Sequence, residues 1–236
     1  MRNDLARKAT AEAVGTCLLV AIVVGSGIYA QRLSPNDVGL QLLENSIATG
    51  AGLVALILAF GSVSGAHFNP VVSLADRVLG GISSRELVVY VPAQIVGGCV
   101  GAVVANVMFS LDAVTLSTHS RSSGGLWLGE VVATFGLLIV ILGVVRSGRA
   151  STAPFAVGGY IAAAYWFTSS TSFANPAVTI ARTLSNTFAG IKPSSAPAFI
   201  VAQVVGGAAA VGLARFLYPQ LPAADLIVPH GHSQAA

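Results

Sequence analysis

Long apolar runs separated by short polar segments dominate the chain. Six of these runs approach the roughly 20 apolar residues that a transmembrane helix needs. They cover about residues 5–31, 40–62, 85–109, 126–147, 152–170 and 196–217. The pattern therefore predicts an all-α membrane protein with six transmembrane helices.

Two further apolar runs, 71–82 and 177–191, are too short to cross a bilayer, and each follows an Asn-Pro pair. Asparagine is a favoured N-cap because its side-chain oxygen accepts from a free backbone N–H. Proline fits the next position, where no N–H is needed. Two half-helices, 69–82 and 175–188, are therefore expected to enter the membrane without crossing it.

The composition agrees with membrane integration, since 54% of the 236 residues are hydrophobic and only 9% are charged. Soluble domains carry about 25% charged residues. The net charge of +3 comes from cations scattered singly, which argues against nucleic-acid binding. Cys17 and Cys99 lack metal-site spacing, and we interpret His230 and His232 of the tail as inert. We expect no metal and no cofactor.

The cations also predict an orientation. With the N-terminus inside, eight Lys and Arg residues fall in cytoplasmic segments and four in outer loops. Positive charge accumulates on the cytoplasmic side of membrane proteins. Both termini are therefore expected in the cytoplasm.

The chain repeats itself in three places. "AEAVGT" at 11–16 matches "GEVVAT" at 129–134, "FNPVVSLA" at 68–75 matches "ANPAVTIA" at 174–181, and "AQIVGG" at 93–98 matches "AQVVGG" at 202–207. Three spans per half would make the second half enter from the opposite side, an inverted repeat with its site near the midplane. The expected division is a first repeat at 1–110, a connecting loop at 111–125, a second repeat at 126–218 and a flexible cytoplasmic tail at 219–236.

Half-helices entering from opposite faces would meet at the bilayer centre. Irregular backbone at that depth is tolerated only where it is buried in protein or lines a wet cavity. The residues before each Asn-Pro pair are therefore expected to line a pore with their carbonyl groups. This carbonyl ladder comprises Gly65, Ala66, His67, Phe173 and Ala174. We interpret the His67 side chain as packing within the loop.

Glu12 and Glu130 are carboxylates inside predicted spans, where charge is costly and suggests a function. One interpretation is a proton-relay pair in a coupled transporter. The other is that each glutamate accepts hydrogen bonds from the adjacent re-entrant loop and braces it. Their duplication, without a buried Lys or Arg partner, favours bracing.

Together these motifs resemble the aquaporin, or major intrinsic protein, family. "SGAHFNP", the second "NPA", the duplicated glutamates and the "AQ…GG" helices carry the resemblance over about residues 8–217. It implies six spans, two half-helices, a narrow pore in each subunit and a homotetramer. The implied pore centre comprises Asn69, Pro70, Val71, Asn175, Pro176 and Ala177. Val71 departs from the family's usual alanine.

The resemblance also implies a selectivity filter on the outer side of this centre. Counted from the motif asparagines, the filter falls on Thr49, Ala163, Ser172 and Val178. Most relatives carry arginine where this chain has Val178, so we expect a wider, arginine-free gate. Arg182 lies one helical turn further on the same face. It either occupies the outer vestibule or partly restores the missing charge.

The combination of "HFNPV" and "ANPAVTIAR" is similar to bacterial aquaglyceroporin-like proteins associated with arsenic resistance. The implied partners are water, small neutral solutes (arsenous acid, methylated arsenicals and glycerol-like polyols) and the lipid of a bacterial inner membrane. We expect a passive channel and no catalytic residues. The alternatives are a water-selective aquaporin, an ion- or proton-coupled transporter and a non-conducting scaffold.

Overall fold

The computed structural model describes residues 2–219, and all regular structure in that part of the chain is helical. The long helices are α1 (Arg2–Leu33), α2 (Val38–Ser64), α4 (Ser84–Met108), α5 (Gly124–Arg146), α6 (Ala153–Phe167) and α8 (Ala196–Leu217). The short α-helices are α3 (Pro70–Leu79) and α7 (Pro176–Ala181). Three 3-10 turns, η1 (Ala150–Thr152), η2 (Arg182–Leu184) and η3 (Pro193–Ser195), complete the set. The predicted all-α architecture of six long helices and two half-helices is confirmed.

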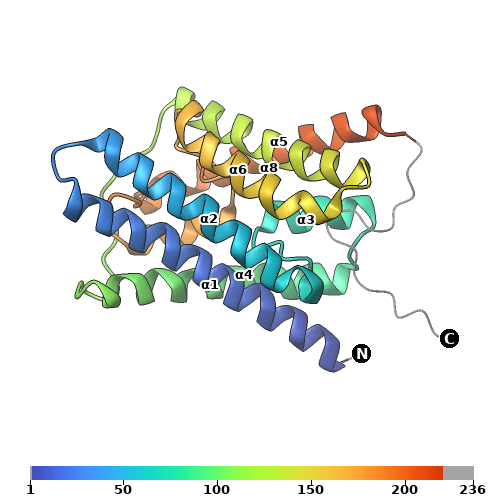
Figure 1. Ribbon diagram of the computed structural model, residues 1–236, viewed down its shortest axis with the longest axis horizontal. Helices are drawn as coiled ribbons and strands as arrows, with labels where there is room; N and C mark the ends of the chain where they lie inside the picture. Colours follow the sequence, from blue (N-terminus) through green and yellow to red (C-terminus); the bar gives the residue numbers. More distant parts are fainter. Residues whose placement is uncertain (1, 220–236) are drawn as a thin grey trace.

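The long helices lie side by side along the long axis of the molecule, and α3 lies among them (Figure 1). Helix α1 packs against α2 and α4, while α5 packs against α6 and α8. Contacts between α2 and α6 join these two groups, and α3 contacts α7 between them. The Asn-Pro pairs are thereby brought into the interior.

Glycines allow several of these helices to approach very closely. A Cβ atom added at Gly97 or Gly101 of α4 would lie 2.1 or 2.2 Å from the carbonyl oxygens of Ala13 and Cys17 in α1. A Cβ at Gly206 of α8 would lie 2.3 Å from the carbonyl oxygen of Val131 in α5. Small residues commonly permit such backbone contact between membrane helices.

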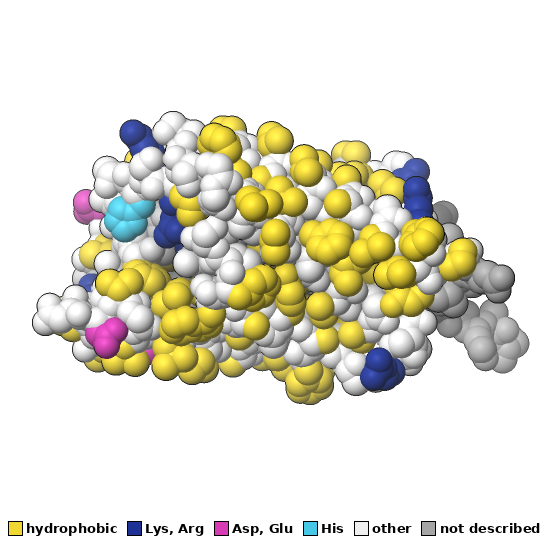
Figure 2. All heavy atoms as spheres, turned by 90° about the horizontal axis from the view of Figure 1, so that it is seen from above, with side chains coloured by type: hydrophobic (Ala, Val, Ile, Leu, Met, Phe, Trp, Pro, Cys, Tyr) yellow, Lys and Arg dark blue, Asp and Glu magenta, His cyan; other side chains and the backbone are white. Residues whose placement is uncertain are grey.

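The molecule turns apolar side chains outward and buries polar ones. Val88 is 70% exposed, Val201 is 64% exposed and Phe216 is 80% exposed, whereas Glu12, Gln94 and Glu130 are fully buried. Figure 2 shows hydrophobic side chains spread over the middle of one face, with Lys and Arg near its two ends. Within the described residues, five helices are long and apolar enough to cross a membrane. This is the surface of an integral membrane protein, as predicted.

Three element boundaries differ from the prediction. Helix α6 has only 15 residues, although η1 directly precedes it. Helix α3 ends at Leu79, before the predicted residue 82, because Gly80 adopts a left-handed φ of 90° and terminates it. Helix α7 ends at Ala181 and continues only as η2 to Leu184, well before residue 188.

Hydrogen bonds from elsewhere explain the early end of α7. The backbone N–H groups of Thr115 and Ser117 donate to the carbonyls of Leu184 and Thr183. The segment between α4 and α5 therefore takes the acceptors that a longer helix would have used. The predicted tail, including His230 and His232, lies outside the described residues except for residue 219.

Candidate functional site

The two Asn-Pro pairs begin the half-helices, as their local chemistry predicts. Asn69 has extended backbone, and its Oδ1 atom accepts from the N–H of Val71 at 3.0 Å. Asn175 does the same for Ala177 and Val178, at 3.0 and 3.2 Å. These contacts orient each side-chain amide along the axis of its helix.

The NH₂ group of each asparagine side chain donates a hydrogen bond to the loop before the other half-helix. Asn69 Nδ2 donates to the carbonyl oxygen of Ala174 at 2.7 Å, and Asn175 Nδ2 donates to the carbonyl oxygen of Phe68 at 2.7 Å. The two motifs are thus linked by a reciprocal pair of hydrogen bonds. An NH₂ group has two hydrogens, so each asparagine keeps one donor for the adjoining cavity, which both residues line.

The loops before the asparagines adopt unusual backbone conformations. Residues with positive φ that are not glycine include Ala66, Phe68, Thr171, Ser172 and Ala174. Such conformations cost ~1–3 kcal/mol each and persist only where surrounding structure imposes them. All five predicted ladder residues line the cavity. One of their carbonyls, that of Ala174, already accepts from Asn69.

Glu12 holds the first of these loops. Its carboxylate accepts from the backbone N–H groups of His67 and Phe68 at 3.0 and 2.7 Å. It also accepts from the Ser64 hydroxyl at 2.6 Å and from Gln94 Nε2 at 2.7 Å. A carboxylate with four donors is well satisfied without a buried cation.

Glu130 has the equivalent contacts in the second loop. It accepts from the N–H groups of Phe173 and Ala174, both at 2.9 Å, and from Gln203 Nε2 at 2.6 Å. Neither glutamate is among the residues that line the cavity. This geometry supports bracing over a proton relay.

Gln94 and Gln203 take part in these hydrogen-bond networks, which we did not predict from the sequence. Besides the glutamates, Gln94 donates to Ser73 Oγ and Gln203 to Thr179 Oγ1, each at 2.9 Å. Each glutamine thereby ties a bracing carboxylate to a half-helix. Their duplication in apolar helices was the available signal.

The cavity also extends along three of the four predicted filter positions. Thr49, Ser172 and Val178 all line it. Ala163 does not, because its side chain is exposed on the outer face of α6. Tyr165 lines the cavity instead, and its hydroxyl lies 3.1 Å from that of Thr49. Residues two positions apart on a helix point in directions that differ by about 200°. A counting error of two residues from Asn175 therefore selects a residue on the face of α6 that points away from the cavity.

Arg182 also lines the cavity, one helical turn beyond Val178, which fits both of its expected roles. The side chain is 2% exposed, and its Cζ atom lies 3.5 Å from the centroid of the Phe173 ring. Its Nε donates to the carbonyl of Ala189. One turn beyond Val178, Arg182 is thus held by a cation–π contact and by the loop that follows η2.

His67 also lines the cavity and is held within its loop. Its Nδ1 lies 3.0 Å from Ser73 Oγ, and its Nε2 lies 3.3 Å from Asp76 Oδ2. The ring also packs edge-on against Tyr90. These contacts support the interpretation of His67 as a packing residue.

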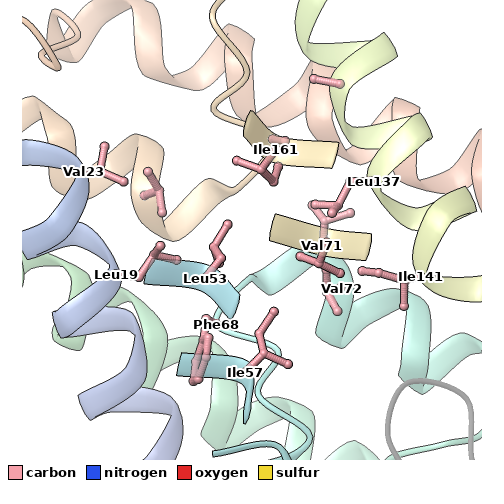
Figure 3. Packing of buried hydrophobic residues seen from close by; sticks show 14 of the residues in the cluster. Leu19, Val23, Leu53, Ile57, Phe68, Val71, Val72, Leu137, Ile141 and Ile161 are labelled. Carbon is pink, nitrogen blue, oxygen red and sulfur yellow. The ribbon is translucent and has the colours of Figure 1, made fainter. Parts of the chain in front are cut away.

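The other walls of the cavity are largely apolar. Figure 3 shows Leu53 and Ile57 of α2 on one side and Leu137 and Ile141 of α5 on the other. The cavity leaves about 70 Å³ for the centres of water molecules. One water needs about 10–15 Å³ by this measure, so a short row of waters fits. No carboxylate is among its described lining residues.

Comparison with known proteins decides the family. A sequence model of the major intrinsic protein family matches residues 1–174. The chain belongs to the major intrinsic protein family. It is also 49% identical to "Aquaglyceroporin AqpS" of Rhizobium meliloti (strain 1021), over 91% of each chain. Members of this family are passive channels, and the chain is accordingly a channel protein and no enzyme.

Two more distant proteins are also similar to this chain, one in sequence and one in fold. The chain is 29% identical to "Probable aquaporin AqpM" of Archaeoglobus fulgidus, over 92% of this chain and 99% of the relative. Its fold is similar to that of the aquaglyceroporin from Plasmodium falciparum, with a TM-score of 0.72 and 22% identity. That comparison covers 91% of this chain and 98% of the solved one.

Proposed function

We propose that the chain conducts water and small uncharged solutes with several hydroxyl groups through the cavity that passes the meeting point of α3 and α7. The observation that supports this proposal is the composition of the cavity wall. The wall is mostly apolar, has two asparagine amides at its centre and includes no carboxylate among the described residues. Such a passage offers hydrogen bonds in sequence to a neutral molecule but no counter-ion to a cation. The N-termini of both half-helices lie at this centre, and their positive dipole ends disfavour cations further.

Glycerol-like polyols are the first proposed solutes, supported by the likeness to an aquaglyceroporin over most of the chain. Arsenous acid and methylated arsenicals are proposed on chemical grounds. Arsenous acid is an uncharged triol at neutral pH and matches glycerol in hydrogen-bonding groups. Val178 favours these larger solutes because its side chain is smaller than arginine.

Within this function, Arg182 supplies the positive charge that Val178 lacks. Only its Nε has a hydrogen-bond partner among the described residues. The terminal nitrogens therefore retain donors toward the cavity. A guanidinium at this point would repel cations while leaving Val178 to determine the local width.

Solute flux into liposomes tests the proposal. Vesicles containing the protein should swell faster than empty vesicles in gradients of glycerol and of arsenite. Val178→Trp should block both fluxes by filling the cavity, whereas Val88→Trp, on the 70%-exposed outer face, should not. Water flux without solute flux would favour a water-selective channel. Uptake against a gradient, driven by protons, would show a coupled transporter.

The assembly and orientation are proposed as well. A homotetramer follows from the family resemblance, and the mass of the solubilised protein by native mass spectrometry tests it. Cytoplasmic termini follow from the eight-to-four distribution of cations. Labelling of single cysteines introduced near Asp4 and Asp112 in intact cells distinguishes the two sides.

A further inference from the structure

A second hollow lies outside the conducting cavity and shares no residue with it. It encloses about 500 Å³ and is lined by Arg77, Val78, Leu79, Gly80, Arg146, Arg215, Tyr218 and Pro219. We call it the basic hollow. Its lining comes from the end of α3, the last residue of α5 and the last turn of α8. The fold thus gathers three arginines that lie about seventy residues apart in sequence.

Each arginine has an ordinary explanation when taken alone. A cation in the last turn of a helix interacts favourably with the helix dipole, and all three occupy such positions. That explanation does not account for their convergence on one hollow, because like charges repel one another. No acidic side chain lines the hollow among residues 2–219.

The guanidinium groups also have few partners. Arg77 Nε donates to Ser84 Oγ at 2.9 Å, and Arg215 Nη2 donates to the carbonyl of Val78 at 3.1 Å. The side chain of Arg146 forms no hydrogen bond within the described chain, and its Nη1 atom is buried without a partner. The ion pairs of the described chain involve none of the three. Most of their donors therefore have no hydrogen-bond partner within residues 2–219.

We propose that the basic hollow binds a phosphate group, carried by an anionic phospholipid or free in solution. Arginine's planar array of N–H groups suits phosphate oxygens, with two parallel hydrogen bonds per pair. The lipid source has structural support, since Phe216 and Leu217, beside Arg215, are 80% and 51% exposed. Basic pockets between transmembrane helices are a known kind of lipid-headgroup site.

Binding to the purified full-length chain tests this proposal. Native mass spectrometry would measure retention of phosphatidylglycerol against phosphatidylcholine, and a parallel titration would use inorganic phosphate. The triple variant R77Q/R146Q/R215Q should weaken binding on the order of tenfold or more. The control R7Q/R85Q/R149Q removes the same charge from exposed arginines outside the hollow and should retain binding.

The results distinguish a lipid phosphate from free phosphate, and they also decide whether the hollow binds phosphate. Selective retention of phosphatidylglycerol identifies a lipid site, and saturable binding of phosphate alone identifies a soluble anion; both support the hollow. Equal losses of binding in the two triple variants would overturn the proposal. So would the absence of both a preference for phosphatidylglycerol over phosphatidylcholine and saturable binding of phosphate. Because Arg215 also holds the end of α3, the double variant R77Q/R146Q provides the same comparison if the triple variant does not fold.

Discussion

The Tyr165 hydroxyl lies 3.1 Å from the Thr49 hydroxyl, and this pair joins α6 to α2 across the outer part of the conducting cavity. Both residues are buried and line the cavity. In α6, Tyr165 rather than Ala163 therefore lies beside Thr49 in the cavity wall. The contact makes this part of the cavity wall aromatic on one side and gives it two adjacent hydroxyl groups.

Truncating this tyrosine should widen the gate. Tyr165→Ala is expected to raise glycerol permeability relative to water permeability, because it removes a large ring from the cavity wall. Stopped-flow swelling of proteoliposomes measures both rates. The control is Ala163→Val, two positions away on the exposed face of α6, which should change neither rate. A larger effect from Ala163→Val would restore the position predicted from sequence.

Introducing arginine at Val178 should narrow the same region. Val178→Arg is expected to reduce glycerol and arsenite flux more than water flux, because Val178 lines the cavity and arginine is far larger. The same swelling assay gives the ratio. Equal losses for all solutes, or no loss, would contradict a filter role for this position.

Neutralising Arg182 should weaken charge exclusion. Arg182→Gln removes the cation that lines the cavity, so proton or sodium leak through proteoliposomes should increase while water flux persists. Arg182→Lys should preserve most of the exclusion. Arg121→Gln is the control, because Arg121 also packs over the Phe173 ring, at 5.1 Å, yet does not line the cavity. Equal leak from both glutamine variants would indicate a disturbed loop.

Removing the charge of Glu130 should reduce stability more than selectivity. Glu130→Gln replaces an acceptor of three hydrogen bonds with a group that carries its own donors. The cost is expected at ~1–3 kcal/mol. Folded yield and thermal stability in detergent measure it, with Asp112→Asn on the exposed loop as control. A normal yield with a new pH dependence of flux would instead support the proton-relay interpretation.

Close helix contact makes Gly101 sensitive to substitution. Gly101→Val should largely prevent folding, since even a Cβ would lie 2.2 Å from the Cys17 carbonyl oxygen. Gly159→Ala, where the added Cβ meets nothing within 4 Å, should fold normally. Size-exclusion profiles of the two variants test the difference.

The sequence by itself determined the set of helices and the starts of the two half-helices. Local chemistry is sufficient for these features: an apolar run of membrane length forms a helix, and an Asn-Pro pair begins one wherever it lies. The duplicated Glu12 and Glu130 also pointed to bracing, which their hydrogen bonds support. The helices and their starts need only neighbouring residues and the polarity of the solvent, and the bracing inference adds the repeat.

Only the tertiary structure decided which side chains meet. Whether Ala163 or Tyr165 faces the cavity depends on the rotation of α6, which its uniformly apolar sequence does not specify. The end of α7 depends on donors from Thr115 and Ser117, more than sixty residues earlier. The basic hollow likewise joins Arg77, Arg146 and Arg215 from three helices. Contacts between distant segments arise from packing, and packing is a property of the whole chain.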